Sequence, residues 1–328
     1  MDHDLTVIGL DAGGTSTRAV LVDSGAHCLG YGIGGRGNPT SAGPERAADG
    51  VMDAIEKSLR GSGKSLPDVA VITASMAGKR ARNDETWLTD RLEQAGFRGR
   101  LTFESDLLAA YYSGSAEPFG YALVSGTGAC VIRVADGDID GTGDGLGWLL
   151  GDRGSGFWIG QRVARAVVED LDGTGPATSL TPALIEALGL QPDDTRTEGR
   201  SQTLALVVSA LYDRAPIELA SFAILAFSDD DDPVATGILR AAGEHLADTL
   251  SAVYTTPATV VVGGSVLARP GPVREAFDAR LGDRAAALDV RLVSDGAVGA
   301  GLLALRAAGV APTTAALQTL ATTLAAHR

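Results

Sequence analysis

The sequence predicts an α/β protein made of two related domains that face one another across a cleft. Apolar strands alternate with amphipathic helices along most of the 328 residues. The order apolar strand, glycine–threonine turn, apolar strand occurs twice, at 7–23 and at 121–138. Glycine, with 43 residues, exceeds its usual share and gathers in turns, where the backbone can approach a ligand closely.

The first domain is expected to span 1–118. Strands at 5–10, 18–23 and 27–33 follow from short apolar runs separated by turn residues. A helix at 44–60 follows from apolar residues at helical spacing. Strands and helices then alternate, with strands at 69–74 and 100–105 and helices at 83–95 and 107–114.

The second domain is expected to span 119–328, with a helical insertion at 160–255, while a C-terminal helix completes the first domain. A strand at 258–264 ends in Gly-Gly, and a helix is expected directly after it. The remaining elements expected are a strand at 289–293, a helix at 297–308, and a surface helix or frayed tail at 312–328. The acidic run 229–232 suggests a metal site, but a solvated loop ending in a helix N-cap is the better interpretation.

Charge and composition exclude several classes of protein. The net charge of -14 leaves no basic stripe for nucleic acid. No apolar run is long enough to span a membrane, and the acidic start "MDHDLT" lacks the pattern of a secretory signal. We therefore expect a cytoplasmic protein, in which Cys28 and Cys130 are reduced, buried thiols.

The stretch "VIGLDAGGTSTRAVLVD" at 7–23 is typical of a phosphate-binding turn, and three templates compete for it. In a Rossmann fingerprint the glycines open a helix, whereas here they open an apolar strand. The ending of a P-loop occurs in "GSGKS" at 61–65, but its first glycine is replaced by Ser58. A hairpin whose turn N–H groups and hydroxyls hold phosphate fits, with Asp11 holding a hydrated magnesium ion.

The order of motifs resembles the actin-like, sugar-kinase and Hsp70-like ATPase superfamily from end to end. "LDAGGTSTRAVLVD" and "LVSGTGACVIRV" resemble its two phosphate motifs, and "VVVGGSV" resembles its adenosine motif. "GGRGNPTSAG", "FESDLLAAYYSG" and "GLGWLLGDRGSGFWIG" resemble N-acetylglucosamine kinases and the BadF/BadG/BcrA/BcrD-type ATPase family. The fold this resemblance implies is a pair of ribonuclease H-like (actin-like ATPase) domains around a central cleft.

The resemblance also implies a function and its residues. The function is transfer of phosphate from ATP, with Mg²⁺, to the 6-hydroxyl of an amino sugar, N-acetylglucosamine being favoured, in a homodimer. Asp106, which matches the family's catalytic base, would accept the hydroxyl proton; a helix N-cap is its alternative role. The residues implied for ATP are Gly13, Gly14, Thr15, Thr17, Gly126, Thr127, Gly128, Gly263, Gly264 and Ser265. Those implied for the sugar are Asn38, Asp106, Thr127, Gly145, Gly147 and Asp152, with Asp11 for the metal.

Two departures from the family pattern bear on the choice of sugar. Leu146 stands where the family commonly has tryptophan, and Arg153 stands where it usually has glutamate. A cation near the sugar site would disfavour a protonated 2-amino group, and so favours the acetylated sugar. Alternatives remain: a glucosamine kinase, an activator ATPase of a partner redox enzyme, and an ATPase or sensor that does not phosphorylate sugar.

Overall fold

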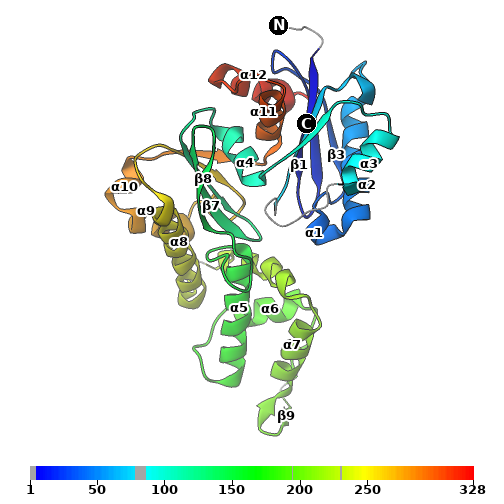
Figure 1. The fold of residues 1–328 in the computed structure, drawn as a ribbon. Helices are drawn as coiled ribbons and strands as arrows, with labels where there is room; N and C mark the ends of the chain where they lie inside the picture. The colour runs from blue at the N-terminus through cyan, green and yellow to red at the C-terminus, as the bar shows by residue number, and fades with distance from the viewer. Residues whose placement is uncertain (1–4, 78–85, 194, 230) are drawn as a thin grey trace.

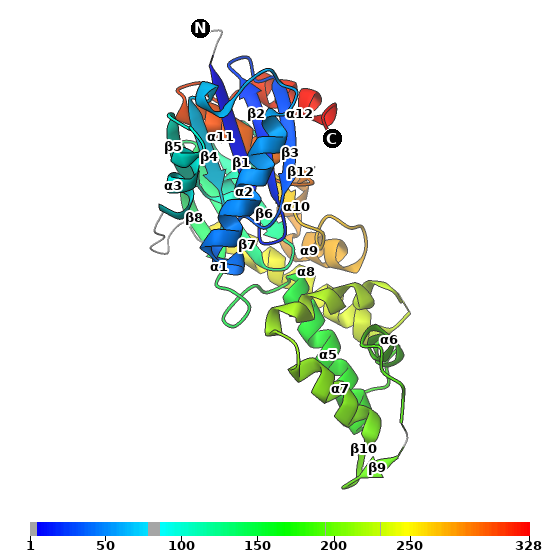
Figure 2. The same ribbon diagram turned by 90° about the vertical axis from the view of Figure 1, so that its right-hand side faces the viewer.

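The computed structural model describes residues 5–77, 86–193, 195–229 and 231–328, and its fold is organised around two five-stranded sheets (Figures 1 and 2). The first sheet has the order β3-β2-β1-β4-β5, and the second has the order β12-β11-β6-β7-β8. Strands β1 (Thr6–Ala12), β2 (Thr17–Asp23), β3 (Cys28–Gly34), β4 (Val71–Ser75) and β5 (Arg100–Glu104) form the first sheet. Strands β6 (Gly120–Ser125), β7 (Ala129–Ala135), β8 (Asp138–Asp144), β11 (Thr259–Gly263) and β12 (Asp289–Val293) form the second.

The two sheets share one topology. In each, three consecutive strands pair antiparallel, a later strand pairs in parallel with the first of the three, and a further strand pairs in parallel with that later one. This is the ribonuclease H-like arrangement, and it occurs once in each sheet. The predicted fold class and the internal repeat are therefore confirmed.

Helices lie on both faces of each sheet. The helices of the described residues are α1 (Pro39–Ala42), α2 (Pro44–Leu59), α3 (Thr86–Gln94), α4 (Asp106–Gly114), α5 (Gly156–Asp172), α6 (Leu180–Ala187), α7 (Gln202–Tyr212), α8 (Pro233–Val253), α9 (Pro272–Leu281), α10 (Asp283–Ala286), α11 (Ala297–Ala307) and α12 (Thr314–Ala325). Short 3₁₀ segments occur at Leu66–Asp68 and, as η2, at Pro216–Phe227. Figure 2 shows α5, α6 and α7 extending away from the two sheets, with the small hairpin β9 (Arg196–Thr197) and β10 (Arg200–Ser201) at their far end.

The middle layer of the molecule consists of α4 and α11, which pack between the two sheets (Figure 1). The contacts are close enough to require glycine: a Cβ on Gly9 of β1 would lie 2.2 Å from the Ala300 carbonyl carbon. One on Gly299 would overlap the backbone of Ala109 in α4. Because side chains on a strand alternate in direction, Val261 of β11 faces this layer while its neighbours face the helices on the other side.

Three details differ from the sequence-based expectation. The stretch 138–144 forms strand β8 although its glycines and aspartates disfavour a strand; pairing with β7 outweighs that propensity. The helix expected directly after Gly264 begins only at Pro272, after a turn. Residues 216–227 form a 3₁₀ segment, and 83–85 of the helix expected at 83–95 lie outside the described residues.

Other expectations hold. The tail at 312–328 contains helix α12, and Asp232 caps α8 through the N–H groups of Val234 and Ala235. Asp230 of the acidic run lies outside the described residues. Within the part of the chain that the structure describes, no helix combines the length and apolar character needed to cross a membrane.

Candidate active site

The first glycine turn, 12–17, is closed by its own backbone. The N–H of Gly13 donates to the Ser16 carbonyl over 3.0 Å, and the N–H of Gly37 donates to the Gly13 carbonyl over 3.1 Å. Gly14 and Thr15 are exposed at its tip. Thr17 is buried, and its hydroxyl donates to the Gly35 carbonyl over 2.8 Å. In this structure, the Thr17 hydroxyl joins the turn to the end of β3.

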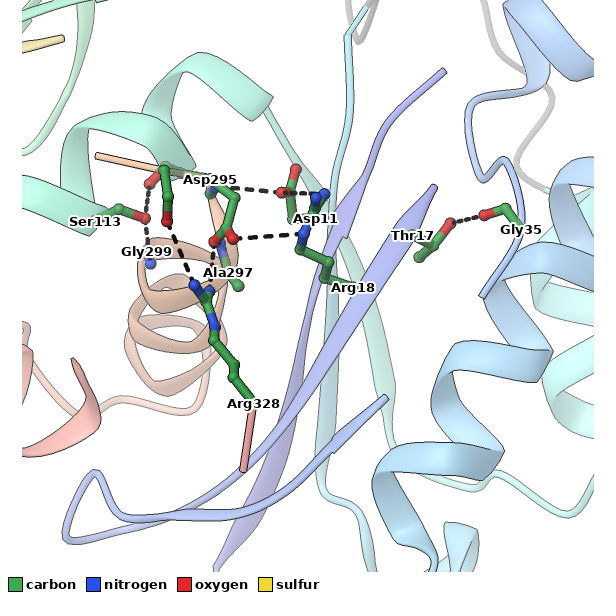
Figure 3. A network of polar contacts seen from close by, with 12 residues as sticks. Asp11, Thr17, Arg18, Gly35, Ser113, Asp295, Ala297, Gly299 and Arg328 are labelled. Carbon is green, nitrogen blue, oxygen red and sulfur yellow. Dashed lines mark hydrogen bonds and ion pairs between the residues drawn. The ribbon is translucent and has the colours of Figure 1, made fainter. Parts of the chain in front are cut away.

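Asp11, at the end of β1, belongs to a charged network that spans both halves of the chain (Figure 3). Its Oδ2 accepts a hydrogen bond from the N–H of Gly296 over 3.1 Å, just before α11. Arg18 bridges Asp11, at 3.7 Å, and Asp295, at 3.4 Å. Asp295 also pairs with Arg328 over 2.7 Å. Asp11 and Gly296, which are 285 positions apart in the chain, are thereby held together at the end of β1.

Burial raises the pKa of Asp11 to about 6. The guanidinium of Arg18 and the Gly296 N–H act in the opposite direction, whereas the charges of Asp295 and Asp106 raise this pKa further. The net shift shows that the surroundings of Asp11 do not fully compensate its negative charge. A cation beside the carboxylate would supply what is missing.

Asp106 is the first residue of α4, and it lies between the two halves of the site. Its charge contributes to raising the pKa of Asp11 on one side and of Cys130 on the other. Burial raises its own pKa, against the hydrogen bond that its Oδ1 accepts from the Leu107 N–H over 2.9 Å. The N-cap of α4 is Ser105, so the capping role considered for Asp106 falls to its neighbour.

The second glycine turn, 125–128, joins β6 and β7 and is packed from two directions. The N–H of Gly156, at the start of α5, donates to the Gly126 carbonyl over 2.7 Å. Gly264 has φ +86, and an added Cβ would lie 2.2 Å from the Ser125 carbonyl oxygen. The structure therefore brings the expected phosphate and adenosine turns into contact, with Thr127 exposed at the tip.

Asp152 lies directly against this second turn. Its Oδ1 accepts a hydrogen bond from the Ala129 N–H over 3.2 Å, and an added Cβ on Gly128 would lie 3.0 Å from its Oδ2. Burial raises the pKa of Asp152, the Ala129 N–H lowers it, and the charge of Asp144 raises it. Asp106, Asp144 and Asp152 all raise the pKa of Cys130, which reaches about 12, mainly through burial. One acidic site therefore contains all three carboxylates.

The loop 144–152 is held in a strained conformation at both ends. Asp144 and Asp152 have φ of 60 and 55, in the left-handed region that residues with a side chain rarely adopt. The Oδ1 of Asp144 accepts the Asp152 N–H over 2.7 Å, and its Oδ2 accepts the Arg153 N–H over 3.0 Å. Strain of this kind persists where surrounding contacts enforce it, and it marks functional loops.

Several expected sugar residues have local roles in this structure. Asn38 caps α1: its Oδ1 accepts the Thr40 N–H over 2.9 Å, and its Nδ2 donates to the Ala77 carbonyl over 3.3 Å. Gly145 and Gly147 both have positive φ, and a Cβ on Gly145 would lie 2.6 Å from the Cys130 Sγ. Their backbone conformation therefore accounts for glycine at both positions.

Arg153 directly follows Asp152 at the end of the loop 144–152. No effect of Arg153 is resolved on the pKa of Asp152, whereas Arg153 does lower the pKa of His245 in α8. The expectation that this cation disfavours a protonated amino sugar stays a prediction.

Sequence reasoning missed four residues of the site: Arg18, Ser75, Asp144 and Asp295. Ser75 is level with Asp11 in the first sheet, and its Oγ is buried without a hydrogen-bond partner in the described structure. Such an atom loses its bonds to water and gains none, so it is available to a ligand or a bound water. The position of Ser75 at the end of a buried strand was the one signal that could have identified it.

The residues present fit a magnesium ion held through water. The described residues contain no group of three or more side chains suited to a full metal shell. Mg²⁺ commonly uses only one or two carboxylates and completes its shell with water and phosphate oxygens. Asp11, whose charge is under-compensated, offers such a carboxylate.

The sequence profile of the BadF/BadG/BcrA/BcrD ATPase family matches residues 8–304. N-acetyl-D-glucosamine kinase of Dictyostelium discoideum is 31% identical over 199 residues, which are 57% of this chain and 61% of that protein. N-acetylmuramic acid/N-acetylglucosamine kinase of Clostridium acetobutylicum is 28% identical over 186 residues, 56% of this chain and 60% of that protein. The chain thus spans less than two thirds of the curated relatives it matches.

A solved structure from Chromobacterium violaceum is similar over a greater length. It has a TM-score of 0.70 and 26% sequence identity, and the match covers 92% of this chain and 99% of the other. Its name gives N-acetylglucosamine kinase as a candidate function.

Proposed function

Because the chain belongs to the BadF/BadG/BcrA/BcrD ATPase family, we propose that it is an ATP-dependent kinase acting on the 6-hydroxyl of an amino sugar. N-acetylglucosamine is the sugar we favour, since both curated relatives carry it in their names. The observation that carries the proposal is the position of Asp106, whose charge acts on Asp11 on one side and on Cys130, close to Asp152, on the other. A carboxylate at this point lies between the proposed phosphate and sugar sites.

In this proposal, the two glycine turns bind the triphosphate. Backbone N–H groups of Gly14 and Gly128, with the exposed hydroxyls of Thr15 and Thr127, supply donors without a lysine, whereas the N–H groups of Gly13 and Gly126 close the turns themselves. The Gly263–Ser265 turn, whose Gly264 lies against Ser125, receives the adenosine. Asp11 would hold Mg²⁺ through water, and the bound ion would supply positive charge against the charge that develops on the phosphates.

Asp106 accepts the proton of the attacking hydroxyl. Burial favours its neutral form, so the carboxylate gains from taking up a proton during the transfer. The Leu107 N–H, at the start of α4, acts in the opposite direction and favours the ionised form. Transfer of this proton by a positioned base is typically worth about 10²–10⁴-fold in rate.

The sugar is proposed to lie against Asp152, whose buried carboxylate still has lone pairs available to ring hydroxyls. Asn38 retains one amide hydrogen that donates no bond within the described structure, and it lies in the half of the site formed by the first sheet. Gly145 and Gly147 leave the loop free of side chains where the N-acetyl group would lie. Thr127 is exposed between the phosphate and the sugar.

Release of ADP tests the proposal. We expect release to depend on N-acetylglucosamine and to be weak with glucosamine, N-acetylmannosamine, N-acetylmuramic acid and glucose. A preference for glucosamine would replace the favoured substrate. ATP hydrolysis that no sugar stimulates would instead indicate a sensor or an activator ATPase. Activators of that kind hold an iron–sulfur cluster between subunits, whereas Cys28 is buried within the first sheet.

Three further statements stay predictions. A homodimer is implied by the family resemblance, and sedimentation velocity would test it. A cytoplasmic location would be tested by fractionation of the source cells. A division near residue 118 would be tested by limited proteolysis, with cleavage expected between α4 and β6.

A further inference from the structure

The segment 35–42, which follows β3 and contains α1, is joined to the first glycine turn by hydrogen bonds. The N–H of Gly37 donates to the Gly13 carbonyl over 3.1 Å, and the Thr17 hydroxyl donates to the Gly35 carbonyl over 2.8 Å (Figure 3). A Cβ added to Gly37 would overlap the buried Thr17 side chain, so glycine is what permits this close approach. The segment that carries Asn38, a proposed sugar residue, is therefore held directly beside the proposed phosphate turn.

Ser41, in α1, lies against the exposed tip of this turn. A Cβ added to Gly14 would lie 3.3 Å from the Ser41 Oγ and 3.7 Å from the Ser41 Cβ. Among the described residues beyond the chain neighbours of Gly14, these two atoms are the nearest to that position. Ser41 is exposed, as are Gly14 and Thr15. The Ser41 hydroxyl is therefore accessible to a ligand that binds at the tip of the turn.

The Ser41 hydroxyl can change its hydrogen-bond partner at little cost. In this structure it donates to the Asn38 carbonyl over 3.2 Å, which is long for a bond between two oxygens. The same carbonyl also accepts the N–H of Ser41 over 3.2 Å and the N–H of Ala42 over 3.0 Å. It would keep these two donors if the hydroxyl turned away, so no acceptor would be left unpaired. A phosphate oxygen, which is charged, is the stronger acceptor for this hydroxyl.

Ser41 lies between the proposed phosphate turn and the proposed sugar residue of the first half. Its side chain contacts Gly14 on one side and donates to Asn38 on the other. In phosphoryl transfer the attacking oxygen, the phosphorus and the leaving oxygen are roughly in line, so the terminal phosphate is the part of ATP that meets the sugar hydroxyl. Of the three phosphates, the terminal one is therefore the group expected between these two sites.

We propose that Ser41 binds the terminal phosphate of ATP through a hydrogen bond from its hydroxyl. The inference rests on the proposed function, because it uses the assignment of the first turn to phosphate and of Asn38 to the sugar. Ser41 adds one donor to those of the exposed tip, the Gly14 N–H and the Thr15 hydroxyl. Because ADP lacks the terminal phosphate, the contact strengthens the binding of ATP and leaves the binding of ADP unchanged.

Calorimetry with two nucleotides tests the proposal on the full chain. The probes are ADP and the β,γ-imido analogue of ATP, each with Mg²⁺. Ser41→Ala should weaken binding of the analogue by about 10-fold or more, the value of one hydrogen bond to a charged group, and should change the affinity for ADP by less than about 2-fold. Ser41→Thr, which keeps the hydroxyl, should restore the affinity for the analogue. Because Ser41 is exposed, Ser41→Ala should leave the melting temperature of the free protein unchanged.

Thr40→Ala is the matched control, because Thr40 is the preceding residue of α1, is exposed and loses the same group. Its backbone N–H, which donates to Asn38, stays in place. The control should change the affinity for either nucleotide by less than about 2-fold. Equal weakening by Thr40→Ala, or equal weakening of ADP and the analogue by Ser41→Ala, would overturn the proposal by showing a general disturbance of α1. An unchanged affinity of Ser41→Ala for the analogue would overturn it as well.

Phosphorus NMR of the bound analogue gives a second readout. The signal of the terminal phosphorus should differ between the unmodified protein and Ser41→Ala, while the α-phosphorus signal stays in place; the reverse pattern would contradict the assignment. The two proposals can fail separately. Selective loss of the analogue in Ser41→Ala, without release of ADP in response to any sugar, would keep the terminal-phosphate contact and remove the sugar kinase. If the unmodified protein binds neither nucleotide, both proposals fail.

Discussion

Asp11→Asn should stabilise the protein near neutral pH while it removes the proposed magnesium ligand. The folded-state pKa of Asp11, about 6, lies above the ordinary value of 3.8. Between these two values the folded protein holds a proton that the unfolded chain has released, so stability falls as the pH rises through this interval. The difference of about 2 pKa units corresponds to about 3 kcal/mol of the free energy of unfolding, and this amount is lost in full above the folded-state pKa.

Asparagine cannot ionise, and its side-chain oxygen can still accept the Gly296 N–H. The variant should therefore match the unmodified protein at about pH 3.5 and exceed it by about 3 kcal/mol at about pH 7.5. Urea unfolding at a series of pH values, with divalent ions chelated, measures this difference. A difference that does not grow with pH, or a lower stability of Asp11→Asn at about pH 7.5, would contradict the raised pKa of Asp11 in the folded protein.

The matched control is Asp53→Asn, since Asp53 is exposed on α2 and pairs with Lys57 over 2.7 Å. An exposed pair of this kind contributes about 0–1 kcal/mol, so this variant should not reproduce the pH-dependent gain. In the presence of Mg²⁺ and ATP, Asp11→Asn should lose the thermal stabilisation that the nucleotide gives. Retained stabilisation would remove Asp11 from the metal site.

The remaining predictions concern the base, the turn contact and a helix cap. Asp106→Asn should lower kcat for sugar phosphorylation by about 10²-fold or more while ATP binding measured by calorimetry persists, and near-full activity would exclude it as the base. Gly264→Ala should weaken ATP binding and lower the melting temperature, because its Cβ would lie 2.2 Å from the Ser125 oxygen at φ +86; an unchanged affinity would show that this contact is dispensable. Although burial opposes its ionisation, hydrogen bonds from Thr178 and its neighbours lower the pKa of Asp232 to about 2. The ionised Asp232 should thus contribute about 2 kcal/mol of stability above the unfolded pKa of 3.8, and this contribution should vanish as the pH falls to about 2. Asp232→Ala should therefore destabilise the protein at about pH 6 but not at about pH 2. Urea unfolding at a series of acid pH values would measure the difference.

Local pattern was sufficient for most of the strands and helices. The apolar run in β1, which is buried on both faces, and the helical spacing in α2 indicate which residues of each segment are buried, and burial is what forms these elements. The repeated hairpin likewise predicted two sheets of one topology. Strand β8 was missed because its glycines and aspartates carry no apolar pattern, and β7 supplies the partner that makes it a strand.

The sequence alone determined the turns, the fold class and the choice of Asp11, Asp106 and Asp152 as the carboxylates to consider. Glycine spacing and strand ends are local features, and the chain shows them without reference to distant residues. Only the tertiary structure decided that Arg18 bridges Asp11 and Asp295, that Asp144 holds the loop before Arg153, and that Gly264 packs against Ser125. These contacts join segments far apart in the chain, and their energies depend on distances and burial that exist only after both sheets have packed around α4 and α11.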